Sequence, residues 1–150
     1  MTIIVRENLF EFERGQEPRK ALQLGGELKK IQNWLTPYLY TSQYKVNSDW
    51  TIDIVRGDFV AYSGKITHIP EFIQFNKCAG AFIIDGMEFD FMQGCPKTVD
   101  GDFHVADNEI KALTGSPEYV GGDYNIRGNP GNFSVADIEK ICEVAGKIFV

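Results

Sequence analysis

Hydrophobic residues in the second half of the chain follow a pattern whose spacing changes within each unit. The clearest unit reads Phe103-x-Val105-x-x-Asn108-x-Ile110-x-x-Leu113. Phe103 and Val105 are two residues apart, which predicts a short strand with both side chains pointing inward. The spacing then widens, which favours a loop or 3₁₀ arc that closes one turn of a coil.

The start of this unit occurs three times at intervals of 21 residues. The three starts are Gly80-Ala81-Phe82, Gly101-Asp102-Phe103 and Gly122-Asp123-Tyr124. An independent pair, Gly94-Cys95-Pro96 and Gly115-Ser116-Pro117, has the same offset. A period of this size is typical of leucine-rich-repeat-like solenoids, in which each turn buries its apolar residues against its neighbours. We therefore expect a short β-solenoid.

Asparagine occupies the bend after the strand in two copies, at Asn108 and Asn129. Its side-chain amide is expected to bond backbone groups of adjacent turns, because those groups have no ladder partner at a bend. Met87 and Gly64 stand at this position in the two earlier copies. The asparagine ladder is therefore expected to be incomplete.

The array is predicted to contain about four turns between residues 46 and 132, with residues 50–54 as a lead-in strand. Its first turn begins near Phe59 and is longer, since 23 residues rather than 21 separate it from the next copy. Three turns are the usual minimum for a stable array. The chain meets that minimum with little to spare.

A helix is predicted over about residues 26–38, because the apolar residues there fall on one face. They are Leu28, Ile31, Trp34, Leu35 and Tyr38. The helix is expected to cover the open N-terminal end of the solenoid, with Trp34 packing in this cap rather than lining a ligand site. Residues 8–26 have mixed charge and predict an ordered arm or loop.

A second cap is predicted at the C-terminal end of the array. Ser134 and Asp137 have the spacing of a capping box, which predicts a short helix that ends at Gly146. Residues 147–150 then predict a closing strand. The chain is thus expected to form one α+β domain, divided into an arm and helical cap (1–45), the solenoid repeats (46–132) and a helix–strand cap (133–150).

The composition argues against several functions. The chain has 150 residues, 43% of them apolar, and a net charge of −6. No apolar run approaches the roughly 18 residues of a membrane span, and the charged start is unlike a signal peptide. The acidic balance argues against a nucleic-acid binder and favours a basic protein surface as the partner. Cys78, Cys95 and Cys142 are an odd, scattered set, which indicates reduced, part-buried thiols of a cytosolic protein.

The sequence offers few candidates for catalysis. Residues 121–128 are rich in glycine but lack the Gly-Lys-Ser/Thr ending of a phosphate-binding loop. Asp102 and Asp123 are expected about 5 Å apart in successive turns, where they could share a proton or a metal, or serve the bend. His68 falls in a turn, and His104 has no serine or cysteine in its column to act as a nucleophile. We therefore expect no enzyme activity, metal or cofactor.

The outward face of the strands is the sharper functional candidate. Repeat equivalence predicts a patch of partner-binding residues there: Val60, Tyr62, Ile83, Asp85, Asp102, His104, Asp123 and Arg127. The N-terminal half of this patch is apolar and its C-terminal half is acidic and polar. Contiguous exposed apolar side chains often mark partner sites. The alternative is that Val60 and Ile83 merely suit a β surface or are covered by the N-terminal arm.

Almost the whole chain resembles a group of small leucine-rich-repeat-like proteins encoded by tailed bacteriophages. The matching segments are residues 5–22, 46–54, 94–103, 115–124 and 133–148. This copy departs from the group at Met87 and Gly64, which replace the usual asparagine, and in its longer first turn. The resemblance implies a solenoid that acts in the cytoplasm of an infected bacterium.

Three functions are open at this stage. The favoured one is a non-catalytic binding protein that captures or inhibits a bacterial host protein, such as a defence factor. The alternative is a virion or assembly component that docks through the arm at residues 10–22. A small enzyme is the least favoured, because no constellation of residues supports one.

Overall fold

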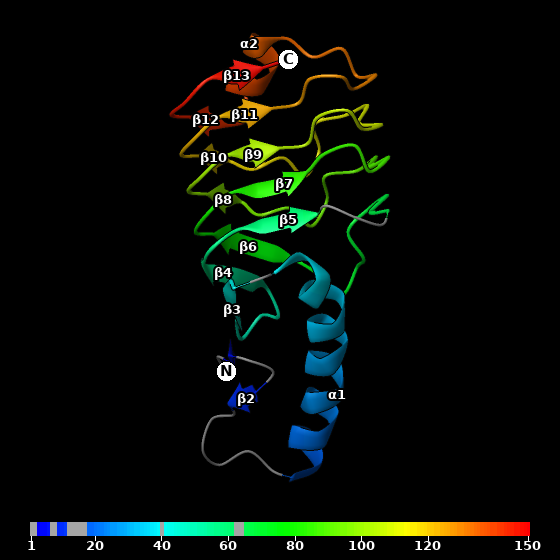
Figure 1. Cartoon of the computed structure of the whole chain (residues 1–150), viewed down its shortest axis with the longest axis vertical. Helices are drawn as coiled ribbons and strands as arrows, with labels where there is room; N and C mark the ends of the chain where they lie inside the picture. The colour runs from blue at the N-terminus through cyan, green and yellow to red at the C-terminus, as the bar shows by residue number, and fades with distance from the viewer. Residues whose placement is uncertain (1–2, 7–8, 12–17, 40, 62–64) are drawn as a thin grey trace.

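A computed structural model of the chain shows a β-solenoid of about four turns, with helix α1 (Pro18–Leu35) on its N-terminal side and a helix and strand at its far end (Figure 1). The structure describes residues 3–6, 9–11, 18–39, 41–61 and 65–150, and the side chains from residue 25 onward. The predicted fold class is therefore confirmed.

Each turn of the coil contributes one strand to each of two sheets, whose solenoid strands are all parallel. The five-stranded sheet has the order β13-β11-β9-β7-β5. Its strands are β5 (Phe59–Ala61), β7 (Phe82–Ile84), β9 (Phe103–His104), β11 (Tyr124–Asn125) and β13 (Ile148–Phe149). Its neighbours pair in parallel throughout, so equivalent residues of successive turns lie side by side.

The second sheet has eight strands, in the order β12-β10-β8-β6-β4-β3-β1-β2. Its parallel part contains β4 (Ile52–Arg56), β6 (Phe75–Cys78), β8 (Thr98–Val99), β10 (Tyr119–Val120) and β12 (Glu143–Val144). Three antiparallel strands extend it: β3 (Gln43–Val46), β1 (Ile3–Arg6) and β2 (Leu9–Glu11).

Most of the second sheet was not predicted, because the sequence analysis assigned one strand and an arc to each turn. The exception is β4, which begins within the predicted lead-in strand at residues 50–54. Strands β8 and β10 contain only two residues each, too few for a period-two signal. The second strands nevertheless follow the same period of 21 residues, since Cys78, Val99 and Val120 pair in register at that interval.

The longer first turn is confirmed by the strand register. Phe59 pairs with Phe82, 23 residues on, whereas Phe82 pairs with Phe103, 21 residues on. In the other sheet, a register shift lies between β4 and β6, because Ile52 pairs with Phe75 but Asp53 pairs with Lys77. Such an irregularity adds an unpaired residue to one strand.

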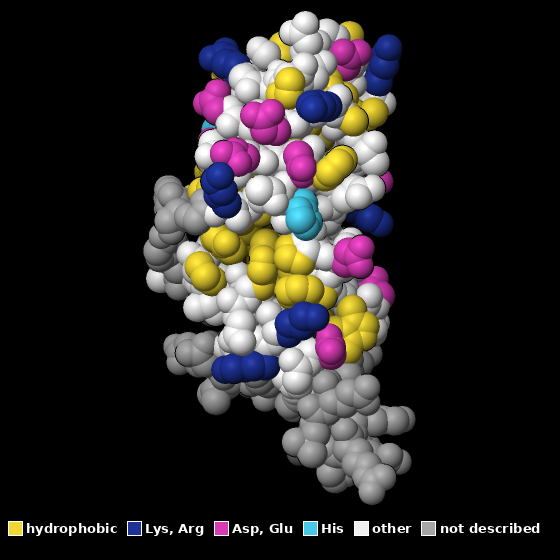
Figure 2. All heavy atoms as spheres, turned by 90° about the vertical axis from the view of Figure 1, so that its right-hand side faces the viewer, with side chains coloured by type: hydrophobic (Ala, Val, Ile, Leu, Met, Phe, Trp, Pro, Cys, Tyr) yellow, Lys and Arg dark blue, Asp and Glu magenta, His cyan; other side chains and the backbone are white. Residues whose placement is uncertain are grey.

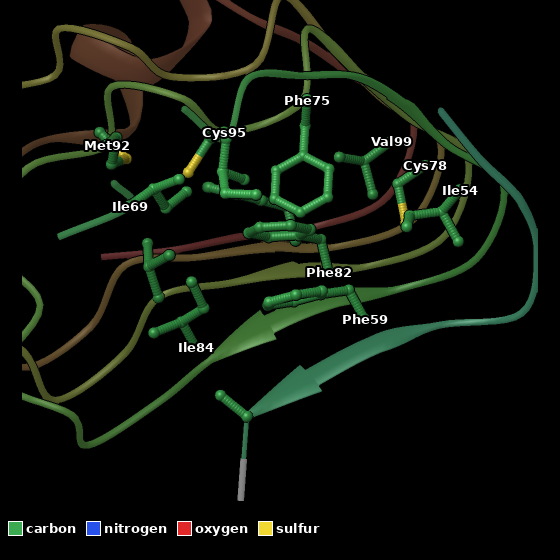
Figure 3. Close-up of a cluster of buried hydrophobic side chains, with 14 of the residues drawn as sticks. Ile54, Phe59, Ile69, Phe75, Cys78, Phe82, Ile84, Met92, Cys95 and Val99 are labelled. Atoms are coloured by element: carbon green, nitrogen blue, oxygen red, sulfur yellow. The ribbon is translucent and has the colours of Figure 1, made fainter. Parts of the chain in front are cut away.

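Aromatic rings stack through the interior from turn to turn. Phe59 and Phe82 lie face to face, with centroids 4.6 Å apart and planes at 12°. The column continues from Phe82 to Phe103 at 6.1 Å and from Phe103 to Tyr124 at 5.0 Å. Figure 3 shows the Phe59 and Phe82 rings stacked, with Phe75 edge-on to Phe82 at 5.2 Å. Each such pair contributes about 0.5–1.5 kcal/mol beyond the area that it buries.

The predicted role of asparagine at the bends is confirmed. Asn108 is 4% exposed, and its Oδ1 accepts hydrogen bonds from the backbone N–H groups of Met87 and Phe89 at 2.8 and 3.1 Å. Its Nδ2 donates to the Ile84 carbonyl at 2.6 Å. Asn129 likewise bonds the turn before it, accepting from the Ile110 N–H at 3.0 Å. Met87 has no such amide, and Gly64 lies outside the described residues.

The N-terminal cap begins earlier than predicted. Helix α1 starts at Pro18, so residues 18–25 are helical and not part of an arm, and the 3₁₀ helix η1 (Thr36–Tyr38) follows it. Pro suits the first turn of a helix, while Gly25 and Gly26 each cost about 1 kcal/mol relative to alanine. Tertiary packing overrides this cost, since Leu28, Ile31 and Leu35 are buried in the core. In the rest of the predicted arm, residues 9–11 form strand β2, and residues 8 and 12–17 lie outside the described residues.

The predicted cap packing of Trp34 is confirmed. Its ring stacks on Phe59 at 5.9 Å, with planes at 15°, and so extends the aromatic column by one step. Tyr38 lies 5.2 Å from both Trp34 and Phe59. The helix therefore takes the place that a further turn would have at this end of the coil.

At the other end, the capping box is confirmed and the helix is shorter than predicted. The Asp137 N–H donates to Ser134 Oγ at 3.1 Å, and the Ser134 N–H donates to Asp137 Oδ2 at 2.9 Å. Helix α2 (Val135–Glu139) then ends well before Gly146. It ends there because Glu143 and Val144 pair with β10 as strand β12. The predicted closing strand is β13, which pairs with β11.

Removal of one ring from the aromatic column should destabilise the whole coil. Phe82 is fully buried, so Phe82→Ala should lower the free energy of unfolding by about 3–5 kcal/mol. Phe91 belongs to the same turn and is 60% exposed, so Phe91→Ala should change it by less than about 0.5 kcal/mol. Urea denaturation followed by circular dichroism measures both, and equal losses would contradict this account.

Candidate functional site on the outer face of the five-stranded sheet

The outer face of the five-stranded sheet, called the strand face below, is built by the repeat. Because side chains alternate along a strand, Phe82 and Ile84 point into the core and Ile83 between them points outward. In-register pairing places the equivalent outward residues of successive turns in a column: Val60, Ile83, His104, Asn125 and Phe149. Two flanking columns contain Asp58, Ala81, Asp102, Asp123 and Lys147 on one side, and Asp85, Ala106 and Arg127 on the other.

The aspartates that precede the strands form a ladder of hydrogen bonds along the coil. Asp58 Oδ1 accepts from the Ala81 N–H at 2.7 Å. Asp102 Oδ1 accepts from the Asp123 N–H, and Asp123 Oδ1 from the Lys147 N–H, both at 2.8 Å. Each carboxylate thus satisfies a backbone donor of the next turn. Of the roles open to Asp102 and Asp123, support of the bend is the one that these contacts show.

Asp85 plays the same part at the other end of its strand. Its Oδ1 accepts from the Ala106 N–H at 2.8 Å, and its Oδ2 lies 3.8 Å from His104 Nδ1. The side chains of His104 and Asp85 are 28% and 40% exposed. An ion pair this exposed contributes at most about 1 kcal/mol. The pair therefore offers polar groups at the surface and adds little to the fold.

Phe149 lies in the C-terminal half of the strand face and was not among the predicted site residues. Arg127 Cζ lies 5.1 Å from the ring centroid of Phe149, a cation–π arrangement. Phe149 joins the central column because Asn125 pairs with it. The signal was present as Gly146-Lys147-Ile148, a further copy of Gly122-Asp123-Tyr124 offset by 24 residues. This offset of 24 residues differs from the repeat period of 21 residues, so the repeat pattern did not indicate the copy.

The expected exposure at the N-terminal end of the face is wrong for Val60. This residue points outward, pairs with Ile83 and is only 8% exposed, so it presents little surface to a partner. It is nevertheless outside the main hydrophobic core cluster. Tyr62 lies outside the described residues. Of the predicted apolar half, Ile83 is the residue that the structure describes as partly exposed.

Glycines of the segment 121–128 have structural roles. A Cβ at Gly121 or Gly122 would clash with the turn before, at Asp100 and Asp102 respectively, so these positions accept only glycine at this turn spacing. Gly128 has a φ of +76°, a conformation that other residues rarely adopt. Close packing between turns thus explains this glycine-rich segment without a phosphate.

Other polar groups in the described part of the chain suggest no reactive centre. His68 is exposed, with Thr67 Oγ1 3.2 Å from its Nδ1, as expected of a turn residue. Among the described residues, no three or more His, Cys, Asp or Glu side chains are grouped as metal ligands would be. None of the described helices combines the length and the apolar character needed to cross a membrane.

The side of the molecule that carries the loops and α1 has its own hydrophobic patch. Figure 2 shows hydrophobic side chains gathered there beside the helical end of the coil, with acidic side chains spread over the turns above. Trp34, Tyr38 and Phe72 are partly buried and pack against the core, and Lys30 Nζ lies 4.4 Å from the Phe72 ring centroid. This packing belongs to the helical cap.

The three cysteines are free and buried, as expected of structural thiols. Burial raises the pKa of the Cys78 thiol to about 12 and that of Cys142 to about 11, and it raises the pKa of Cys95 as well. A thiol that stays protonated is a poor nucleophile. The raised pKa values of the buried thiols do not favour a cysteine-based reaction.

No protein-family model, no curated protein and no solved structure matches the chain.

Loss of one rung of the aspartate ladder should destabilise the coil modestly. Asp102→Ala leaves the Asp123 N–H without its acceptor and should lower the free energy of unfolding by about 1–2 kcal/mol. Asp100→Ala is the matched control, because the Asp100 side chain is exposed and its backbone bond to Cys78 persists. Thermal and urea unfolding would test this. A loss as large in the control would refute a special role for Asp102.

The buried thiols also predict how stability depends on pH. Their pKa values are raised in the folded state, so their contribution is complete below the unfolded pKa of roughly 8.5 and is lost as pH rises through about 11 and 12. The free energy of unfolding should fall between pH 8 and pH 10, by about 2 kcal/mol for a thiol as buried as that of Cys78. Cys78→Ala should reduce the slope. A flat profile in urea denaturation would contradict the assignment.

Proposed function

We propose that the protein is a non-catalytic binding protein whose strand face docks on another protein. The observation that carries this proposal is the character of that face. A flat row of parallel strands presents Ile83, His104 and Phe149 in one column, with Arg127 beside it. Aromatic and arginine side chains are among the groups that contribute most at protein interfaces, and a partly exposed aliphatic side chain adds apolar area to them.

The hydrogen bonds of the carboxylates support binding over catalysis. Asp58, Asp85, Asp102 and Asp123 each give one oxygen to a backbone N–H of the next turn. A general acid or base must be free to exchange its proton with a substrate. Held in this way, the carboxylates are better suited to a fixed, rigid surface than to proton transfer. The proposal accordingly includes no metal and no cofactor.

The partner that best fits the face is a protein with basic residues at its surface. The chain has a net charge of −6, and four aspartates flank or adjoin the strand face. Such a field attracts a basic partner and speeds its association. The resemblance to tailed-phage proteins extends this proposal to a bacterial host protein, such as a defence factor, bound in the cytoplasm of the infected cell.

Affinity capture of the tagged protein from phage-infected bacterial cells, followed by mass spectrometry, tests the proposal. The wild-type chain should retain one host protein in stoichiometric amount, and Ile83→Glu should reduce its capture about tenfold. Val55→Glu is the matched control, because Val55 is 44% exposed at the end of strand β4 of the other sheet. It should capture as the wild type does.

Two outcomes would overturn this function. Capsid or tail proteins as the main catch would favour a virion or assembly component that docks through residues 10–22, which include the start of α1. Equal capture by the wild type and Ile83→Glu, with both chains folded by circular dichroism, would move the site away from the strand face.

A further inference from the structure

The charge on the strand face changes sign along the coil. The aspartates of the face are Asp58, Asp85, Asp102 and Asp123. Its cations are Arg127, two residues beyond strand β11, and Lys147, directly before strand β13. Figure 1 shows β11 and β13 together at the C-terminal end of the coil. In the described columns, negative charge therefore begins at the N-terminal end of the face, and positive charge lies at its C-terminal end.

Phe149 lies between the two cations. Lys147 and Phe149 are two residues apart and point outward, because Ile148 between them packs against the core. Arg127 Cζ lies 5.1 Å from the centroid of the Phe149 ring, which restrains the guanidinium before any partner arrives. A restrained side chain loses less conformational entropy on binding. Arg127, Lys147 and Phe149 are called the basic corner below.

Neither cation of the basic corner has an anionic partner in the described part of the chain. The ion pairs of the described residues involve other side chains. Asp123 lies one turn before Lys147 in the same column, but its Oδ1 accepts from the Lys147 backbone N–H at 2.8 Å. Asn125 Oδ1 likewise accepts from the Arg127 backbone N–H at 3.1 Å. The guanidinium and the ammonium group are therefore solvated by water in the free chain.

A partner that covers the basic corner must replace that water. A charge that is buried without a counter-charge is strongly unfavourable. A carbonyl or hydroxyl oxygen would accept one hydrogen bond and leave both positive charges uncompensated. A carboxylate supplies the missing charge, and its two oxygens match the paired N–H groups of a guanidinium. Docking on this end of the face thus favours an anionic group over a neutral one.

We infer that the partner protein places an aspartate or glutamate carboxylate on the basic corner. The inference rests on the proposed function and adds to the basic residues that the aspartates attract. The contact surface of the partner then carries both charge signs in a fixed order along the coil. Because the reversed orientation would oppose like charges, the strand face accepts its partner in one direction.

A small carboxylate tests the basic corner in the absence of the partner. N-acetylglutamate N-methylamide is titrated into the ¹⁵N-labelled full chain, with N-acetylglutamine N-methylamide as the neutral control. The Arg127 Nε–H resonance should shift at least about twofold more with the carboxylate than with the neutral amide. It should also shift more than that of Arg56, an exposed arginine on the other sheet, and Phe149→Ala should reduce this difference. Equal shifts of Arg127 and Arg56 would overturn the inference.

Charge reversal tests the inference with the host protein that the wild-type chain retains. Arg127→Glu should weaken binding of the purified pair at least about tenfold in isothermal titration calorimetry, and Arg127→Lys should weaken it less. Lys111→Glu is the matched control, because it changes the net charge equally at an exposed position outside the strand face. It should bind as the wild type does.

Reversal on the partner identifies the contact. One aspartate or glutamate of the host protein, changed to arginine, should restore binding to the Arg127→Glu chain. A scan of its acidic surface residues in which no change restores binding would contradict the inference. Phosphatase treatment of the host protein should leave binding unchanged. Loss of binding after that treatment would place a phosphate on the basic corner instead of a carboxylate.

The variants also separate this inference from the proposed function. Binding that is lost in Ile83→Glu but equal in the wild type and Arg127→Glu overturns the carboxylate inference and leaves the proposed function standing. Equal binding by all three chains, each folded by circular dichroism, overturns the proposed function itself.

Discussion

The rest of the structure depends on the in-register stacking of successive turns, which the column of aromatic rings in the core makes visible. Trp34, Phe59, Phe82, Phe103 and Tyr124 follow one another through the core at centroid distances between 4.6 and 6.1 Å. No turn could bury its own rings alone, because each turn supplies only two short strands and a bend. Helix α1 joins the column through Trp34.

The same register creates the strand face. Once Phe82 lies over Phe59 and Phe103 over Phe82, the outward residues between the stacked positions must also align, as Ile83 and His104 do. The aspartates before the strands then meet the N–H groups of the next turn. The register between successive turns therefore determines both the packing of the core and the alignment of residues on the strand face.

Much of the scaffold was accessible from local pattern alone. The inward pair Phe103 and Val105, the bend asparagine Asn108 and the capping box at Ser134 are all as predicted. Each of these signals uses residues close together in the chain. The second sheet was missed because strands such as β8 and β10 have two residues each and are stabilised by pairing with other turns. The start of α1 was misplaced because Gly25 and Gly26 disfavour a helix that the burial of Leu28 and Ile31 maintains.

The sequence by itself determined the period, the choice of inward and outward residues and the two ends of the array, because these follow from residue spacing along the chain. Tertiary structure alone decided how exposed each outward residue is and which polar groups are satisfied. Val60 and Ile83 have the same pattern in sequence, yet Val60 is buried and Ile83 is partly exposed. For Asp102 and Asp123 the sequence leaves a shared proton or metal and support of the bend both open, and their hydrogen bonds to backbone N–H groups show the second role. Burial and hydrogen bonding at these sites depend on atoms contributed by other turns, about 21 residues or more away in the chain, which no local pattern encodes.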